Sequence, residues 1–311
     1  MKGVIIIPTF YAKRHKKGKR SRISKYLFHR LRAIYKLPLL YSDDPKLSNW
    51  DVALSYAVPY HNRPQLPQSF LKANNTKLIS YFGDLPCWYN KTCERNKRRM
   101  FNRADVVMGG YHEKFLKWFP EYVDKYEFFP AFFFPYERYA CLEPNLKPIM
   151  KCLLIGSIRK HYPFRHLIKG MYKRNTGGLK MLMDVVKGSI KVSAGKYPAF
   201  LNSYFCAIAT SGTNSCIVAK YFEIPASGTL LLGERKPELD LLGFKPYVHY
   251  VPITPKNVIE QIKKVLYHPK EYFEIREKGM RFVRRNHSDI NRVIQFRRVL
   301  DRALGIDECE S

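Results

Sequence analysis

Short apolar runs rich in Val, Ile and Leu alternate with longer charged stretches up to about residue 130. Such runs suit buried strands of a parallel sheet, because helices cover both faces of these strands. The charged stretches at 91–103 and 113–119 are expected to be helices. Strands that alternate with helices form βαβ units, so this half of the chain predicts a parallel α/β domain. The expected strands are 4–7, 51–56, 77–82, 105–108 and 126–129.

The same alternation starts again after a segment rich in proline. Residues 130–148 contain four prolines and no clear periodicity, which predicts a linker at about 136–150. Beyond it, strands are expected at 151–155, 206–210 and 229–232. Thr254 and Pro255 predict an N-cap and a first helical residue. The expected organisation is an N-terminal domain at 1–135, the linker, and a C-terminal domain at 151–311 that ends in a helix at 288–304.

Two parallel-sheet domains of this kind predict a ligand cleft between them. In open α/β sheets, ligands bind outside the carboxyl ends of the strands. No stretch of the sequence approaches 18 consecutive apolar residues, so a conventional membrane span is not expected. The seven cysteines form no CxxC pair and no cluster with metal-ligand spacing. We therefore expect reduced thiols in a cytoplasmic protein, and no bound metal.

The formal charge of +29 is the extreme value of the composition. Residues 13–36 contain eleven Lys or Arg and no acidic residue, and part of this segment has the spacing of an amphipathic helix. Such a segment is usually a solvated basic face. Its functional alternatives are an anionic membrane surface, a polyanionic acceptor or nucleic acid. Nucleic acid is not expected, because no signature of a nucleic-acid-binding module is present.

Two loops at expected strand ends have the composition of anion-binding sites. Gly156 and Ser157 follow the strand at 151–155, and three cations come next: Arg159, Lys160 and Arg165. A glycine turn lets backbone N–H groups approach a phosphate, which cationic side chains then neutralise. The second loop opens onto a helix and consists of small polar residues: Ser211, Gly212, Thr213, Asn214 and Ser215. Helix N-termini favour anions, so this loop is a second candidate.

The helix expected after the second loop carries Lys220 and Glu223. A lysine there could pair with phosphate, and a carboxylate could accept two hydrogen bonds from a ribose diol. Alternatively, the two side chains could form an ordinary surface ion pair three residues apart. Local sequence alone leaves these two interpretations even.

The run Lys220–Leu232 resembles the donor-site helix and following strand of glycosyltransferases with the two-domain GT-B fold. It is most similar to the CgeB/YkvP-like group, which is related to family 1 and family 4 enzymes. Other matching pieces occur in the right order between Cys152 and Leu304. They are Gly156-Ser157, Tyr162–Arg165, Gly195–Tyr197, Pro237–Leu239, Leu242–Phe244, Tyr250-Val251, the helix after Thr254, and Arg284–His287.

This resemblance implies transfer of a sugar from a nucleotide-sugar, such as a UDP- or GDP-sugar, to a glycan, lipid or protein acceptor. It implies two Rossmann-like domains that face a central cleft, with the donor held by the C-terminal one. Glu223 would bind the ribose, and Lys220 would face the diphosphate without a metal or other cofactor. The remaining implied donor-site residues are Gly156, Ser157, Arg159, Lys160, Arg165, Ser211, Gly212, Thr213, Asn214, Ser215 and Gly228.

The sequence departs from the retaining family 4 pattern at one position. A second glutamate precedes the ribose-binding one by eight residues in those enzymes, whereas Ser215 stands there in this chain. Retention and inversion at the sugar are therefore both open. Asp84 and His61 follow expected strands of the N-terminal domain and are the candidates for the catalytic base.

Two other functions compete with the transferase. A basic protein that binds a membrane or nucleic acid would explain residues 13–36 but not the ordered motifs around Lys220. A sugar-nucleotide epimerase of the same fold would act on the donor alone. The expected partners are the nucleotide-sugar, a glycan or lipid-linked acceptor and, through peripheral contact, an anionic membrane.

Overall fold

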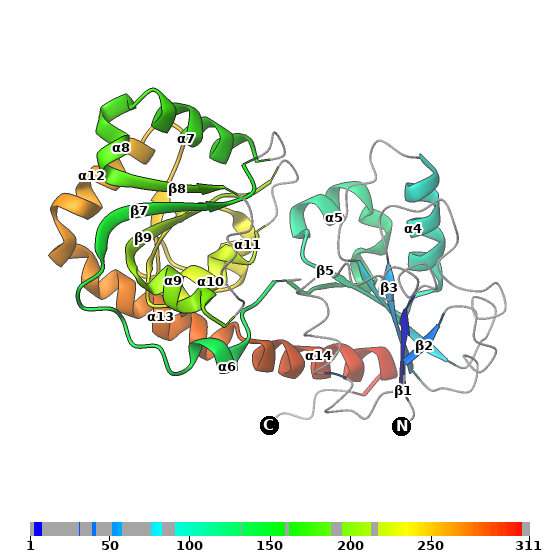
Figure 1. Cartoon of the computed structure of the whole chain (residues 1–311). Helices are drawn as coiled ribbons and strands as arrows, with labels where there is room; N and C mark the ends of the chain where they lie inside the picture. Colours follow the sequence, from blue (N-terminus) through cyan, green and yellow to red (C-terminus); the bar gives the residue numbers. More distant parts are fainter. Residues whose placement is uncertain are drawn as a thin grey trace. The chain divides into compact units, whose positions relative to one another are not determined.

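The computed structural model describes residues 3–7, 31, 39–41, 52–57, 76–82, 91–130, 132–158, 162–187, 195–212 and 217–306. The chain divides into two compact units (Figure 1). One comprises Met1–Ala131 and Asp289–Ser311, and the other comprises Phe132–Ser288. Each unit is built on a sheet whose neighbouring strands are all parallel. The predicted class, α/β with two parallel-sheet domains, is confirmed.

The first unit has a sheet in the order β2-β1-β3-β4-β5-β6. Five of its strands lie within one residue of the predicted ranges, and β2 was not predicted. A strand of three residues is too short to show a periodic pattern. The elements of this unit are β1 (Gly3–Ile7), β2 (Leu39–Tyr41), β3 (Val52–Ala57), β4 (Lys77–Phe82), α4 (Lys91–Arg103), β5 (Val106–Gly109), α5 (His112–Trp118), η2 (Pro120–Lys125), β6 (Tyr126–Phe128) and α14 (Asp289–Leu304).

Aromatic side chains form much of the core of the first unit. Phe82 at the end of β4 stacks on Phe115 of α5 with ring centroids 5.2 Å apart. Phe115 also stacks on Tyr126, at 4.1 Å. Phe101 of α4 meets Phe82 at 5.9 Å. Stacked and edge-to-face rings each add to the stability that burial of their area already provides.

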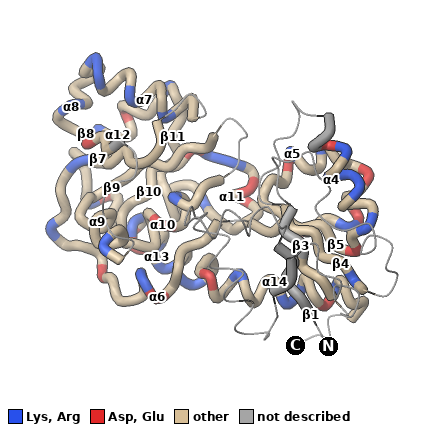
Figure 2. Tube along the Cα trace, turned by 45° about the vertical axis from the view of Figure 1, so that its right-hand side comes forward, with Lys and Arg blue, Asp and Glu red and all other residues tan. Residues whose placement is uncertain are grey.

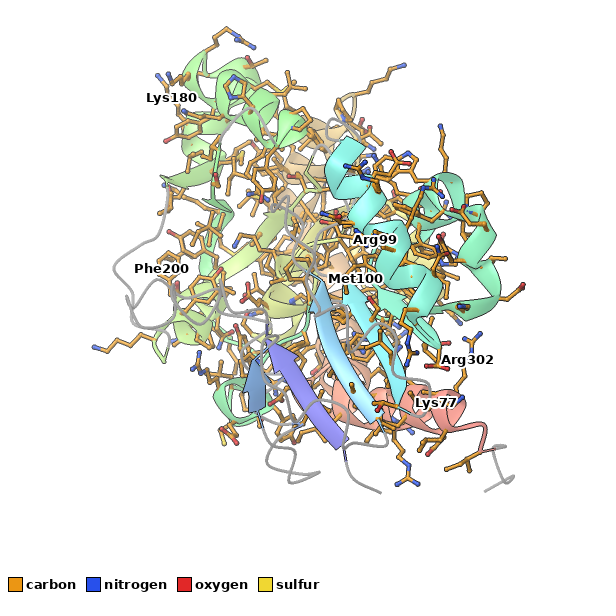
Figure 3. All side chains as sticks on the ribbon, turned by 90° about the vertical axis from the view of Figure 1, so that its right-hand side faces the viewer. Lys77, Arg99, Met100, Lys180, Phe200 and Arg302 are labelled. Atoms are coloured by element: carbon orange, nitrogen blue, oxygen red, sulfur yellow. The ribbon has the colours of Figure 1, made fainter. Side chains whose placement is uncertain are left out.

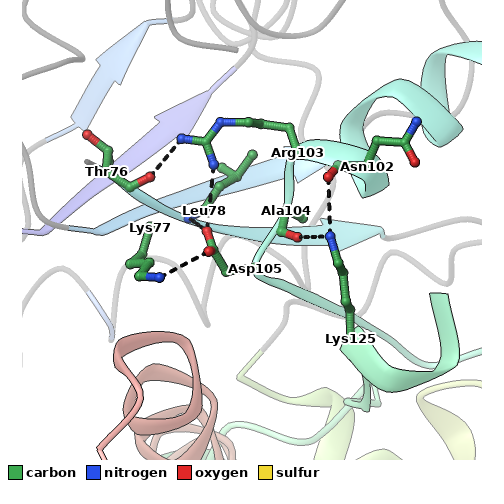
Figure 4. Close-up of polar contacts among 8 residues, drawn as sticks. All are labelled: Thr76, Lys77, Leu78, Asn102, Arg103, Ala104, Asp105 and Lys125. Atoms are coloured by element: carbon green, nitrogen blue, oxygen red, sulfur yellow. Dashed lines mark hydrogen bonds and ion pairs between the residues drawn. The ribbon is translucent and has the colours of Figure 1, made fainter. Parts of the chain in front are cut away.

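The amino-terminal ends of β4 and β5 are fixed by polar contacts (Figure 4). The Asp105 carboxylate accepts hydrogen bonds from the Leu78 N–H at 2.7 Å and from Lys77 Nζ at 3.3 Å. Arg103 donates to the Thr76 carbonyl at 2.9 Å. Lys125 donates to the Ala104 carbonyl at 2.9 Å, just beyond the C-terminus of α4, where free carbonyls favour a cation. These contacts fix the path of the chain from α4 into β5.

The C-terminal helix α14 was expected to belong to the C-terminal domain, and the structure places it in the first unit. It packs against β4 and β5 and buries Val293, Phe296 and Leu300. Arg302 near its end donates to the Tyr126 carbonyl at 3.2 Å and to the Glu127 carboxylate at 2.9 Å (Figure 3). The apolar spacing of this helix was legible in the sequence, but spacing does not tell which sheet the helix covers.

The second unit has a sheet in the order β11-β10-β9-β7-β8. Its central strand β9 is buried at every position, as expected for a strand covered on both faces. The elements of this unit are α6 (Tyr136–Tyr139), β7 (Ile149–Gly156), α7 (Pro163–Lys173), η3 (Thr176–Gly178), α8 (Leu179–Leu182), β8 (Met183–Lys187), α9 (Tyr197–Asn202), β9 (Tyr204–Ala209), α10 (Lys220–Ala226), β10 (Leu230–Glu234), α11 (Pro237–Leu241), β11 (Val251–Ile253), α12 (Val258–Tyr267), η4 (Pro269–Tyr272) and α13 (Phe273–Asn286).

The start of α12 corrects the prediction that Pro255 is the first residue of this helix. The helix begins at Val258 and no side chain caps it. Thr254 and Asn257 instead bond each other in the preceding turn: the Thr254 N–H donates to Asn257 Oδ1 at 2.7 Å, and the Asn257 N–H donates to Thr254 Oγ1 at 3.3 Å. The side chains of Thr254 and Asn257 therefore each accept a hydrogen bond from the other residue's backbone N–H, and together they stabilise the turn before the helix.

Candidate functional site

The sheet of the second unit has a topological switch point between β7 and β9. The chain leaves β7 toward β8 on one side, while β9 and the later strands lie on the other side. Loops that leave two such neighbours diverge, and ligands of open α/β sheets bind in the resulting crevice. Gly156 and Ser157 lie at the carboxyl end of β7, and Ser211 and Gly212 follow β9. The structure thus brings both predicted anion-binding loops to one place.

Arg165 joins the two loops at this point. It is a buried residue of α7, and its guanidinium donates to the Ser157 carbonyl at 2.9 Å and to the Thr210 carbonyl at 3.2 Å. It also lies over the Tyr162 ring, with Cζ 4.4 Å from the centroid. Burial lowers the pKa of Arg165, although an arginine keeps its charge at any physiological pH. Arg165 therefore fixes the loops and places a positive charge beneath them.

Gly156 allows two cations to approach the end of β7. Its φ of +117° lies in the region that favours glycine. A Cβ at this position would lie 3.0 Å from Lys220 Cε and 3.3 Å from Arg165 Nη1. Lys220 and Arg165 therefore converge on the backbone of Gly156.

Lys220 is held in this corner by Tyr197. Its ammonium group donates a hydrogen bond to the Tyr197 hydroxyl at 3.1 Å and lies 5.7 Å from the centroid of the same ring. Burial lowers the pKa of Lys220, the Glu223 carboxylate raises it, and the Arg165 guanidinium lowers it. Tyr197 belongs to the short motif Gly195–Tyr197, which the sequence comparison singled out without giving it a role.

Glu223 lies one turn further along α10. Its carboxylate has no hydrogen-bond or ion-pair partner among the residues that the structure describes. Burial raises the pKa of Glu223, and Lys220 opposes that shift. Burial, and then the charge of Glu223, raise the pKa values of Tyr139 and Tyr197, so both phenols lie near the carboxylate. The structure shows no ion pair between Lys220 and Glu223, and the Lys220 ammonium group instead donates to the Tyr197 hydroxyl.

Glu234 is a residue of this edge that sequence reasoning missed. Its Oε2 accepts hydrogen bonds from the Ser211 N–H at 2.9 Å and from the Ser211 hydroxyl at 2.8 Å. Lys236 pairs with Oε1 at 2.8 Å. The Ser211 N–H, which was expected to be free for an anion, is thus occupied. Glu234 ends β10, and a contact across 23 residues leaves no local pattern in the sequence.

Gly228 was predicted with the donor site, but the structure places it at the opposite edge of the sheet. It follows α10 and precedes β10, with a φ of +78°. Its N–H donates to the Pro225 carbonyl at 2.9 Å, and a Cβ there would lie 3.1 Å from Pro144 Cα. Glycine is needed here to end the helix and turn the chain. The amino end of β10 is remote from the carboxyl ends that form the crevice.

Several predicted site residues lie outside the described part of the chain. They are Asp84, His61, Arg159, Lys160, Thr213, Asn214 and Ser215, and the basic segment 13–36 falls there too, apart from Leu31. Within the described residues of the first unit, His112 lies after β5 and begins α5. Its ring meets Tyr126 and Phe128, with centroids 5.7 and 5.6 Å away, and burial lowers its pKa.

No group of three or more His, Cys, Asp or Glu among the described residues could hold a metal ion. None of the helices in the described ranges is both long and apolar enough to cross a bilayer. The described cysteines Cys141, Cys152 and Cys206 are free thiols.

Comparison with known families assigns the C-terminal half of the chain. Residues 147–298 match the family described as "Glycosyl transferase-like". This range contains the whole crevice, from the end of β7 to Glu234. No curated protein matches the chain in sequence.

Solved structures extend the likeness to almost the whole chain. HepE of Anabaena in complex with UDP is 10% identical, and the match covers 97% of this chain and 100% of HepE with a TM-score of 0.62. Its complex with UDP-glucose gives a TM-score of 0.60 over 97% and 99% of the two chains, at 10% identity. A glycosyltransferase from Rickettsia africae ESF-5 is 9% identical over 97% and 98%, with a TM-score of 0.59. At these identities the likeness is one of fold.

The predicted GT-B fold is confirmed, and the family match over residues 147–298 agrees with the expected glycosyltransferase activity. The narrower resemblance to the CgeB/YkvP-like group stays a prediction. A fold by itself does not determine the substrates of an enzyme, which depend on the residues of its site.

Proposed function

We propose that this enzyme transfers a sugar from a UDP-sugar to an acceptor, and that the donor binds at the β7–β9 switch point of the second unit. The observation that supports this most is a pair of residues: Glu223, whose carboxylate has no partner among the described residues, and Lys220, which lies against Gly156. An anion-binding corner and a hydroxyl-accepting carboxylate, one helical turn apart, suit a nucleoside diphosphate. HepE was solved with UDP and UDP-glucose, which supports uridine as the base.

The proposed roles follow from where each side chain lies. Lys220 pairs with the diphosphate, which approaches the backbone of Gly156 and Ser157 closely. Glu223 accepts hydrogen bonds from the ribose hydroxyls. Arg165 fixes the two loops and adds positive charge. From the sequence, the remaining donor contacts are proposed at Gly212, Arg159, Lys160, Thr213, Asn214 and Ser215.

The chemical step breaks the bond between the sugar and the diphosphate. Negative charge then develops on the departing UDP, and preorganised cations stabilise it more strongly than water would. Lys220 and Arg165 supply such charge, so we propose that transfer proceeds without a metal ion. The acceptor hydroxyl must lose a proton, and Asp84 and His61 remain the proposed bases for that step.

The acceptor and location are proposed from charge. Among the described elements, helix α4 by itself contains six Lys or Arg residues and one Glu (Figure 2). Arg98 of this helix is paired with Glu94 and Glu121, whereas Arg95 and Arg99 are exposed. This surface and segment 13–36 favour an acidic or phospholipid-linked glycan acceptor, reached at an anionic membrane from the cytoplasm. The membership of the CgeB/YkvP-like group is proposed on the motifs between Cys152 and Leu304.

A thermal-shift measurement tests the donor site. UDP-glucose should raise the melting temperature of the wild type and should shift Lys220→Met far less. Lys264→Met is the matched control, because Lys264 is an exposed lysine of the same unit that pairs with Glu260 on α12. No shift with any UDP- or GDP-sugar, together with stabilisation by anionic vesicles or a nucleic-acid duplex, would overturn the proposal in favour of a binding protein. Conversion of donor alone into an epimeric sugar nucleotide would favour an epimerase.

A further inference from the structure

Among the residues that the structure describes, Tyr197 is the one whose side chain bonds the Lys220 ammonium group. Lys220 donates to the Tyr197 hydroxyl at 3.1 Å and also lies 5.7 Å from the centroid of its ring. The ring begins α9, while Lys220 begins α10, so the contact joins two helices that flank β9. A flexible lysine would otherwise sample many rotamers, and a fixed one loses less freedom when an anion binds.

The hydroxyl of Tyr197 uses only part of its bonding capacity on Lys220. An ammonium group has no acceptor, so the tyrosine oxygen must be the acceptor in this contact. Its own O–H therefore remains a donor. The Glu223 carboxylate lies near enough to raise the pKa of Tyr197, although burial has the larger effect. Tyr197 thus gives the Lys220 ammonium group an acceptor and keeps one donor of its own.

We propose that Tyr197 is a positioning residue of the donor site, which keeps the Lys220 ammonium near Gly156 for the diphosphate and gives it an acceptor other than Glu223. This inference rests on the proposed function. The second acceptor matters, because a direct ion pair between Lys220 and Glu223 would neutralise both groups that the donor needs. The arrangement explains why two opposite charges three residues apart on α10 do not pair.

Steady-state kinetics with UDP-glucose test the proposal. Tyr197→Phe keeps the ring and removes the oxygen, and a hydrogen bond to a charged group corresponds to about a tenfold or larger effect on affinity. We expect kcat/KM for UDP release to fall about tenfold, mainly through KM. Tyr204→Phe is the matched control, because Tyr204 also loses a hydrogen-bonded hydroxyl, to Asp184 at 3.0 Å, but lies at the opposite edge of the sheet. It should leave the kinetics unchanged.

Two further readouts separate positioning from a general effect on folding. In the Lys220→Met background, Tyr197→Phe should cause no further loss, because the residue on which it acts is absent. The basic limb of the pH profile should also move to lower pH in Tyr197→Phe. The groups that face Lys220 are Tyr197, Glu223 and Arg165, and loss of the Tyr197 oxygen removes one acceptor that favours the charged lysine.

The outcomes distinguish this inference from the proposed function. If the wild type releases UDP and Tyr197→Phe matches it, or loses equally in both backgrounds, the inference is wrong and the proposed function stands. If the wild type neither binds UDP nor uses UDP-glucose, the proposed function fails. Acetylation of Lys220 at pH 8–9, followed by mass spectrometry, then still decides the positioning. Faster acetylation in Tyr197→Phe supports it, and an unchanged rate overturns it.

Discussion

Replacement of Glu223 by glutamine should change donor affinity and apoprotein stability in opposite directions. The carboxylate is half-buried and has no partner among the described residues, so in the absence of donor its charge is poorly solvated. The resulting pKa of Glu223 is raised, even with Lys220 nearby. A group of this kind stabilises the fold when neutral, so Glu223→Gln should not lower the melting temperature and is expected to raise it. A structural ion pair would give the reverse result.

The pH dependence carries a definite sign. Because burial raises the folded-state pKa of Glu223 above its ordinary value, the folded state binds this proton more tightly than the unfolded state does. Its contribution to stability is therefore fully present below the unfolded pKa and is lost as pH rises through the folded pKa. The difference in free energy of unfolding between Glu223→Gln and wild type should thus grow as pH rises across that window.

Donor binding should weaken by an amount that two hydrogen bonds can explain. A bond to a charged acceptor contributes about 1.5–3 kcal/mol and a bond to a neutral one about 0.5–1.5 kcal/mol. Two ribose bonds should therefore lose about 2 kcal/mol, which is about 30-fold in Kd. Isothermal titration with UDP measures this directly. As a control, the loss of affinity from UDP to 2′-deoxy-UDP should be smaller in Glu223→Gln than in the wild type, because the neutral amide oxygen accepts a weaker hydrogen bond.

A contrary result would be clear. If Glu223→Gln binds UDP as tightly as the wild type and melts at a lower temperature, Glu223 stabilises the fold and does not contact the donor. Glu260→Gln provides the comparison for an ordinary carboxylate, because Glu260 is exposed and pairs with Lys264 at 2.7 Å. The Glu260→Gln variant should change neither the affinity for UDP nor the direction in which the free energy of unfolding changes with pH.

Three other substitutions and one condition give distinct outcomes. Gly156→Ala should lower the melting temperature and donor affinity together, because a φ of +117° disfavours alanine and its Cβ would displace Lys220. Gly228→Ala should cost about 1–2 kcal/mol of stability, measured by urea unfolding, with kcat/KM unchanged in the folded fraction. Glu234→Gln should weaken UDP binding, because it loosens the hydrogen bonds to Ser211. Its effect on the melting temperature should be small, because no apolar side chain is removed from the core. UDP release should persist in excess EDTA, and a loss restored by Mg²⁺ would contradict transfer without a metal.

The sequence predicted most strands because burial on both faces leaves a continuous apolar run. One helix of the second unit was harder to predict from the sequence. Helix α13 was not predicted as a separate element, since its buried positions include Arg276 and Gly279 and so break the apolar stripe. Gly279 is there for space: a Cβ would lie 2.3 Å from the His249 carbonyl oxygen. Contacts of this kind, made between distant segments, have no local signature.

The crevice was predicted in part for the same reason. Loops at strand ends are visible in sequence, and the topology rule brings the ends of β7 and β9 together. The actual bonding is not visible: Arg165 binds two carbonyls, and Ser211 binds Glu234. Gly228 shows the complementary error. A motif match groups residues by order along the chain, whereas the two ends of one strand lie at opposite edges of the sheet.

The local arrangement of charged side chains says more about the function of this chain than its net charge does. A formal charge of +29 predicts attraction to any polyanion, so it cannot distinguish a membrane from nucleic acid or a nucleotide-sugar. The proposed donor site would make that distinction with a few groups. Lys220 and Arg165 converge at Gly156, and Glu223, one turn away, has no partner among the described residues. A uniform polyanion would be repelled by that carboxylate, whereas a nucleoside diphosphate offers anionic oxygens to the cations and hydroxyl donors to Glu223. We therefore expect the arrangement to favour a ligand with two chemically different ends.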